Sequence, residues 1–122
     1  MIRVWLIAAG LGGFLSVAAG TAAAHLPASE RAAELLRTGA LYGMVHATAL
    51  IAVTAVAESS GRRRLALTIA GWSFAAGTLL FSISLFALAL TGSAWLGMIT
   101  PFGGAGLLVG WVSVAFSASA RR

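Results

Sequence analysis

The chain has 122 residues, of which 60% are hydrophobic and 9% are charged. Soluble domains usually carry about 25% charged residues, so these proportions exclude an ordinary soluble domain and indicate a surface that faces lipid. The sequence contains no cysteine, which excludes disulfides, thiolate metal sites and iron–sulfur clusters. The net charge of +5 comes from arginines at the ends of apolar runs, a pattern typical of membrane topology signals rather than nucleic-acid binding.

The first apolar run covers residues 2–24 and follows a basic start. It is longer than the core of a signal peptide, about 7–15 residues, so we interpret it as an uncleaved transmembrane helix. Small side chains recur along it at every fourth position, which lets another helix approach closely in lipid. These small residues are Ala8, Gly12, Ser16, Gly20 and Ala24.

Residues 25–38 carry two glutamates and two arginines on one helical face and apolar side chains on the other. This pattern predicts a short amphipathic segment that lies in the membrane interface. The second span follows at 39–57, and Gly39 and Gly43 begin another stripe of small residues.

Residues 65–91 form a third run with no ionisable side chain, long enough to cross a bilayer at about 1.5 Å per residue. Thr100 and Pro101 are favourable residues for a helix start and predict a fourth span over 100–119. Gly106 and Gly110 form a GxxxG pair within it, and we interpret both as helix-packing residues.

The predicted fold is therefore all-α: one membrane domain over 1–122, in which four transmembrane helices form a bundle. With four spans, six of the eight arginines fall on the side of both termini and of the second loop. The positive-inside rule then places both termini in the cytoplasm.

Several stretches of the sequence are distinctive in combination: GTLLFSISLFALALTG over 77–92, ITPFGG over 99–104, the Gly110–Trp111 pair, LYGMVHA around Tyr42 and His46, and GTAAAH over 20–25. Together they resemble the DUF423 (UPF0382) family of small bacterial inner-membrane proteins. The resemblance covers nearly the whole chain. It implies a multi-pass protein of the inner membrane, and it implies no particular activity.

His46 and Tyr42 are the ionisable side chains well inside a span, one helical turn apart on the same face. A buried ionisable group in a membrane is costly and marks a candidate site. We expect His46, about 10 Å deep at 1.5 Å per residue, to contact a hydroxyl of the third span. The candidate polar cluster comprises Tyr42, His46, Thr78, Ser82, Ser84 and Thr100.

Two readings of this cluster stay open: a neutral histidine that holds helices together, or a site for a proton or a ligand. A haem or metal ligand is a weaker alternative. His25 and His46 are expected at different depths, and two histidines without a carboxylate are a poor ligand set. We therefore expect no metal, no cofactor and no catalytic residues. Arg62, Arg63 and Arg64 are interpreted as a topology signal or as ligands of lipid headgroups.

These features favour a non-enzymatic membrane protein with a packing or accessory role. The alternatives are a transport module for a small solute, proton or lipid, and a redox subunit that holds haem or quinone. The expected partners are membrane lipids and a larger membrane complex or further copies of the chain, without nucleic acid.

Overall fold

The computed structural model describes residues 1–26, 29–60 and 64–119. Its long helices are α1 (Ile2–His25), α2 (Glu30–Ser59), α3 (Leu65–Thr91) and α4 (Thr100–Ser119), and the short 3₁₀ helix η1 (Ala94–Met98) precedes α4. Within the described ranges, four helical segments are long and apolar enough to cross a membrane, and no strand occurs. The predicted all-α membrane fold is therefore confirmed.

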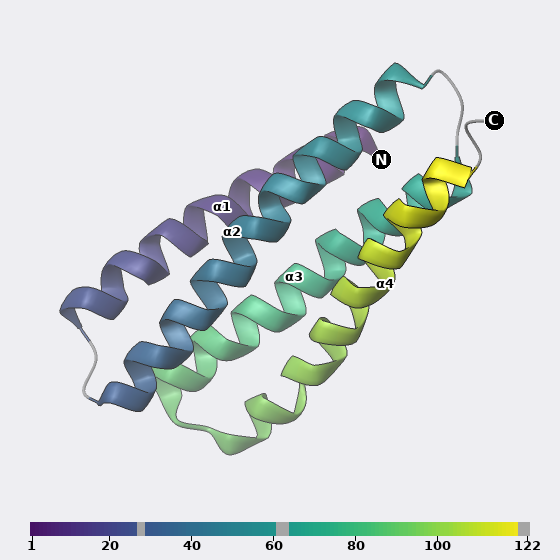
Figure 1. The fold of residues 1–122 in the computed structure, drawn as a ribbon. Coiled ribbons are helices and arrows are strands. Elements are labelled where there is room, and N and C mark those ends of the chain that lie inside the picture. The colour runs from purple at the N-terminus through teal and green to yellow at the C-terminus, as the bar shows by residue number, and fades with distance from the viewer. Residues whose placement is uncertain (27–28, 61–63, 120–122) are drawn as a thin grey trace.

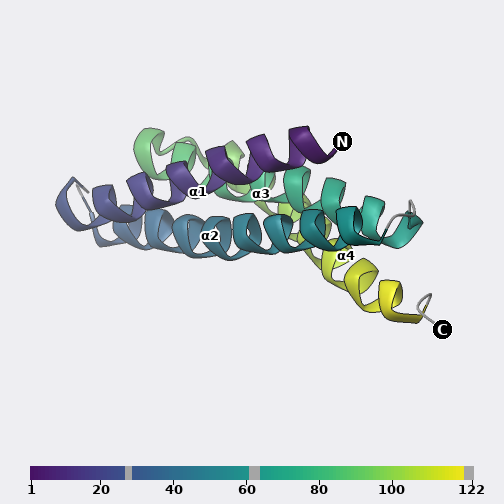
Figure 2. The ribbon, with the colours of Figure 1, turned by 90° about the horizontal axis from the view of Figure 1, so that it is seen from above.

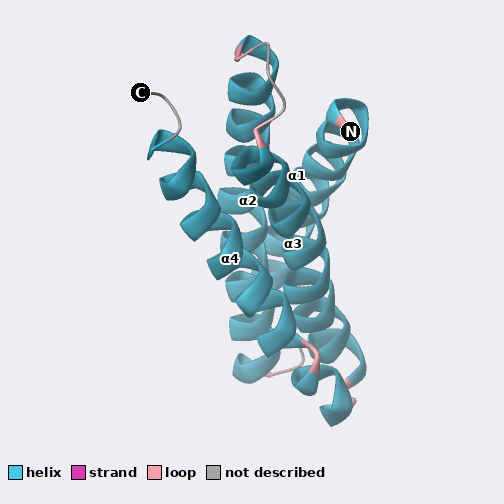
Figure 3. Cartoon of the chain, turned by 90° about the vertical axis from the view of Figure 1, so that its right-hand side faces the viewer, coloured by secondary structure: helices cyan, strands magenta, loops and turns pink. Residues whose placement is uncertain are grey.

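The helices run alternately up and down (Figure 1). The start of α1, the end of α2, the start of α3 and the end of α4 lie at one end of the molecule, here called the terminal end. The end of α1, the start of α2, the end of α3 and η1 lie at the other, called the loop end. The central helix is α3, which packs against α2 on one side and α4 on the other, while α1 packs mainly on α2. Towards its C-terminus α4 leans away from the other helices (Figures 2 and 3).

The bounds of α1, α3 and α4 agree with the predicted spans to within one residue, but α2 is longer than predicted. It begins at Glu30, where the Ser29 hydroxyl accepts a hydrogen bond from the Ala32 N–H at 3.1 Å. The predicted amphipathic segment is therefore the first part of α2 rather than a separate interfacial element. Its apolar face is buried at Leu36 because α1 and α3 extend far enough to cover it.

The predicted stripe of small residues on α1 only partly faces another helix. Gly12 and Ser16 are buried, whereas Ala24 is exposed. A spacing of four residues drifts by about 40° per step around a helix of 3.6 residues per turn, so the ends of the stripe turn away. The buried face of α1 combines steps of three and four: Trp5, Ala9, Gly12, Ser16, Ala19 and Ala23.

Glycines bring α3 and α4 into close contact. A Cβ atom added to Gly110 would overlap the ring of Phe74, and one added to Gly106 would lie 3.3 Å from the Cα atom of Gly77. Both glycines of the GxxxG pair therefore pack against α3 of the same chain. Gly103, one turn earlier, sits directly on the backbone of Phe81.

Candidate functional site

His46 lies in the middle of α2 and is buried, with 5% of its surface exposed. Its Nδ1 atom lies 2.7 Å from the carbonyl oxygen of Tyr42, one turn earlier. The indole N–H of Trp111, on α4, donates a hydrogen bond of 3.0 Å to Nε2. Because an indole can only donate, Nε2 must accept and Nδ1 must carry the proton. Both nitrogens of a neutral imidazole are thus satisfied within the chain.

Aromatic rings surround this imidazole. The ring of Tyr42 stacks nearly parallel to it, with centroids 6.0 Å apart, and those of Phe74 and Trp111 approach to 5.7 and 5.8 Å. Phe81 completes the group at 4.9 Å from Tyr42. We call Tyr42, His46, Phe74, Phe81 and Trp111 the aromatic cluster. It joins α2, α3 and α4 at one level, although α2 and α4 make few other contacts.

The contact predicted between His46 and a hydroxyl of α3 is wrong, and the register of α2 against α3 explains why. Ser82 donates a hydrogen bond of 2.9 Å to the carbonyl oxygen of Gly39. Since these helices are antiparallel, His46, two turns beyond Gly39, lies beside Phe74, two turns before Ser82. The hydroxyl of Ser82 is therefore too close to the loop end to reach the imidazole.

Of the other predicted polar residues, Tyr42 lies beside His46 as predicted, whereas Thr78, Ser84 and Thr100 form no hydrogen bond with it. Ser84 and Thr100 share a hydrogen bond of 2.7 Å between their hydroxyls. Thr100 therefore connects the start of α4 to α3 instead of capping its own helix. The first turn of α4 closes through the carbonyl oxygen of Ile99, which accepts from the Phe102 N–H at 3.1 Å.

Two hydroxyls in the core between α1, α2 and α3 have no hydrogen-bond partner among the described residues. They are the Ser16 Oγ and Thr78 Oγ1 atoms, both buried. Ser16 lies against Gly43, where an added Cβ atom would overlap its Oγ atom. Thr78 lies beside Gly12, where an added Cβ atom would be 3.9 Å from its methyl group. Small residues thus let three helices meet around hydroxyls that contribute no hydrogen bond.

Two grooves open between α2 and α4, and Trp111 lines both. The loop-end groove, of about 600 Å³, is also lined by Tyr42, His46 and Leu108. The terminal-end groove, of about 210 Å³, is lined mainly by aliphatic side chains, including Val53 and Val114. The bridge between Trp111 and His46 therefore divides one apolar face into two compartments.

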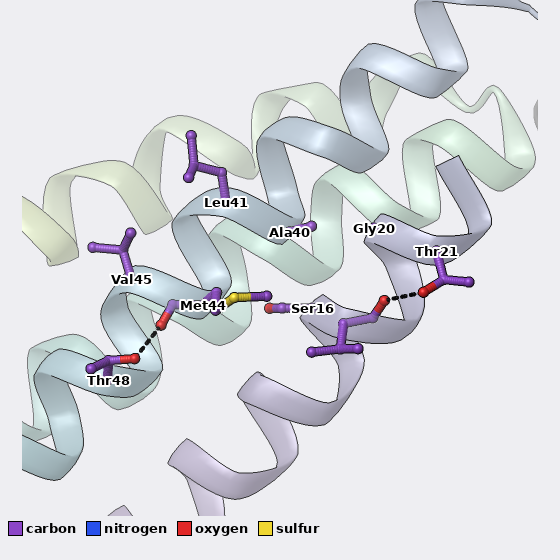
Figure 4. Close-up of a pocket in the computed structure, with 9 residues that line it drawn as sticks. Ser16, Gly20, Thr21, Ala40, Leu41, Met44, Val45 and Thr48 are labelled. Atoms are coloured by element: carbon purple, nitrogen blue, oxygen red, sulfur yellow. Dashed lines mark hydrogen bonds between the residues drawn. The ribbon is translucent and has the colours of Figure 1, made fainter. Parts of the chain in front are cut away.

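A third groove, of about 690 Å³, lies between α1 and α2 towards the loop end (Figure 4). The hydroxyls of Thr21 and Thr48 on its walls donate to carbonyl oxygens of their own helices, those of Val17 and Met44. This groove consequently offers a bound molecule mostly aliphatic contacts and few free polar groups.

The two histidines do not come together. His25 is exposed at the end of α1, whereas His46 is buried in the aromatic cluster. Among the described residues, no group of three histidine, cysteine or acidic side chains could hold a metal ion. Arg62 and Arg63 lie outside the described residues; Arg64 is described and precedes α3.

We expect His46→Leu to lower the free energy of unfolding by about 1 kcal/mol, the scale of a hydrogen bond between membrane helices. Trp111→Phe removes the donor and keeps an aromatic ring. If the hydrogen bond is the main link, the two changes together cost less than the sum of the single losses. Denaturant titration in mixed micelles measures these energies.

His46→Gln provides the rescue, because an amide can both donate and accept. It is expected to retain most of the stability that His46→Leu loses. Trp95→Phe is the matched control, since Trp95 is exposed on η1. Equal coupling of His46→Leu to Trp95→Phe and to Trp111→Phe would contradict a specific bridge.

Comparison with known proteins is consistent with this membrane architecture. The family described as "Protein of unknown function (DUF423)" matches residues 19–104. The UPF0382 membrane protein YwdK of Bacillus subtilis is 33% identical over 123 residues, which cover 96% of this chain and 97% of that protein. A UPF0382 membrane protein of Haemophilus influenzae is 39% identical, covering 95% and 94% of the two chains.

The UPF0382 inner membrane protein YgdD of Escherichia coli K12 is 36% identical over 115 residues, covering 89% of this chain and 84% of that protein. No solved structure matches the chain. The family match covers most of the sequence, and the relatives align over nearly their full length. The chain therefore belongs to the DUF423 family of UPF0382 membrane proteins.

Proposed function

We propose that this chain is a non-enzymatic accessory protein of the bacterial inner membrane, which binds a transmembrane helix of another membrane protein in its loop-end groove. One observation carries the proposal: the imidazole that lines the groove already has both nitrogens hydrogen-bonded within the chain, and the wall on α4 is apolar and exposed. Both nitrogens of His46 are engaged within the chain, so the imidazole is committed to holding α2 and α4 together.

The wall on α4 has the form of a helix-binding surface. It consists of Pro101, Gly104, Ala105 and Leu108, which recur at steps of three and four and therefore share one helical face. This face differs from the buried face of Gly103, Leu107 and Gly110. Small residues allow a second helix to approach closely, and Leu108 supplies a large exposed contact.

Photo-crosslinking in intact cells tests the proposal. A benzophenone amino acid at Leu108 is expected to give a discrete protein adduct, identified by mass spectrometry. The same group at Phe14, exposed on α1, serves as the control position. Gly104→Leu should remove the adduct by filling the groove, whereas Gly10→Leu should not, because Gly10 faces open space.

Equal adducts at Leu108 and Phe14, or an adduct that persists in Gly104→Leu, would reject the proposal. An adduct between two copies of the chain would show that the groove binds another copy of this chain rather than a different membrane protein. Proton or solute flux in liposomes that hold the purified chain alone would favour the transport alternative instead.

The proposed orientation places both termini in the cytoplasm, because in the sequence six of the eight arginines lie near the start of α1, between α2 and α3, or after α4. A reporter active only in the cytoplasm should therefore work when fused after Arg122 or inserted at Ser60. Inserted beside Ser29, at the loop end, it should be inactive. Activity beside Ser29 with inactivity at the other two positions would reverse the orientation.

A further inference from the structure

The terminal-end groove carries an inference that does not depend on the proposed partner helix. Its walls come from α2, α3 and α4 and include Ala52, Val56, Leu67 and Val114. It lies where α4 leans away from the other helices (Figures 2 and 3). With a volume of about 210 Å³ and walls that are mainly aliphatic, with Phe74 and Trp111 beside them, it suits a segment of one hydrocarbon chain rather than a polar ligand.

A positive charge lies at the start of α3, just before the residues of α3 that line this groove. Arg64 is the N-cap residue of α3 and stands three positions before Leu67, which lines the groove. The Nη1 atom of the Arg64 guanidinium is buried and has no hydrogen-bond partner among the described residues. An unpartnered guanidinium N–H group is costly, and a phosphate oxygen is the acceptor that matches it best.

Most of the other arginines also lie, in the sequence, next to helix ends at the terminal end, so their charge has the same sign as that of Arg64. In the sequence, six of the eight arginines lie in the first turn of α1, between α2 and α3, or after α4. The acidic side chain near these positions is Glu58, in the last turn of α2. Basic residues beside a membrane span attract anionic lipid, at about 1 kcal/mol each near the surface. The terminal end is therefore complementary to an anionic headgroup.

From this arrangement we propose that the terminal-end groove binds an anionic phospholipid. Arg64 donates hydrogen bonds to the lipid phosphate, and one acyl chain lies between α2 and α4 with its far part against Trp111. The bound chain fills the space that the leaning α4 leaves open. The occupant is a membrane lipid, since a free phosphate would leave the apolar walls uncovered.

Native mass spectrometry of the purified chain in detergent tests this site. Phosphatidylglycerol and phosphatidylcholine with identical acyl chains are compared at equal concentration, and glycerol 3-phosphate serves as the headgroup alone. We expect retention of phosphatidylglycerol in preference to phosphatidylcholine, and no retention of glycerol 3-phosphate. Arg64→Gln should weaken phosphatidylglycerol binding about tenfold, the equivalent of one charge-assisted hydrogen bond.

Ala52→Phe tests the acyl-chain part, because Ala52 is exposed and lines the groove. It should weaken phosphatidylglycerol binding, whereas Ala55→Phe, exposed on α2 but outside the groove, should not. Arg31→Gln is the charge-matched control at the loop end. Thermal melting without added lipid checks that each variant is folded.

Three results would overturn the proposal. Equal affinity for the two lipids would show that the lipid charge does not contribute to binding. Equal effects of Arg31→Gln and Arg64→Gln would show that the net charge of the protein, rather than Arg64 at this site, attracts the lipid. Unchanged binding in Ala52→Phe would place the lipid outside the groove. None of these outcomes depends on the crosslinks at Leu108, so the lipid site and the partner helix can fail separately.

Discussion

Replacing Gly103 by alanine is expected to detach α4 from α3 and to lower the free energy of unfolding by about 3 kcal/mol, the upper range for overpacking. The added Cβ atom would lie 2.8 Å from the Cα atom of Phe81 and closer still to its backbone nitrogen. A backbone cannot rotate away as a side chain can, so the whole helix must move. Denaturant titration in mixed micelles measures the loss.

Gly104→Ala is the matched control, because it changes the adjacent residue of the same helix. Its Cβ atom would meet the ring of Phe81 at 3.8 Å, an ordinary contact. Alanine has a higher helix propensity than glycine by about 1 kcal/mol, so this variant is expected to be neutral or slightly stabilised. Similar losses in the two variants would show that helix flexibility, rather than close contact, explains the glycines.

The ends of three helices could be predicted from the sequence because charge and turn residues mark them. Arg64 and Gly92 flank α3, and Gly92 adopts the left-handed backbone conformation (φ 71°) that ends a helix. The start of α2 could not be read in the same way. Its first turns are amphipathic, which is typical both of an interfacial segment and of a helix that projects beyond the apolar core.

The earlier start of α2 also explains why the predicted partners of His46 are wrong. A second span that starts at Gly39 places the beginning of α2 level with the end of α3. The observed start at Glu30 shifts the register by more than two turns, so Ser82 meets Gly39 and His46 meets Phe74. A predicted start at Glu30 would have placed His46 beside Phe74 and its neighbouring aromatic rings.

Trp111 was missed as the partner of His46 for a second reason. All four spans are hydrophobic on every side, so periodicity does not show which face of α4 meets α2. The partners predicted for His46 are hydroxyl groups. Yet an indole N–H within a span needs an acceptor as much as an imidazole needs a donor. That requirement was the signal available in the sequence.

At the terminal end, Gly71→Ala is expected to have an effect of similar size to Gly103→Ala. Trp5 is fully buried, and a Cβ atom on Gly71 would overlap its six-membered ring. The ring is held in place by further contacts, including an edge-to-face contact with Trp72 at 6.0 Å between centroids. We therefore expect a loss of about 3 kcal/mol, since a filled core has no room for the indole to move.

A double-mutant cycle with Trp5→Phe identifies the cause. Phenylalanine removes ring atoms beside Gly71, and it also removes an indole N–H group that has no partner among the described residues. Gly71→Ala should therefore cost less in the Trp5→Phe background, with a coupling of about 1–3 kcal/mol. Gly10→Ala on α1 is the control, because nothing lies within 4 Å of that position. If Gly71→Ala cost the same in both backgrounds, the indole would not be the obstacle, and the close approach of α1 to α3 would have another cause.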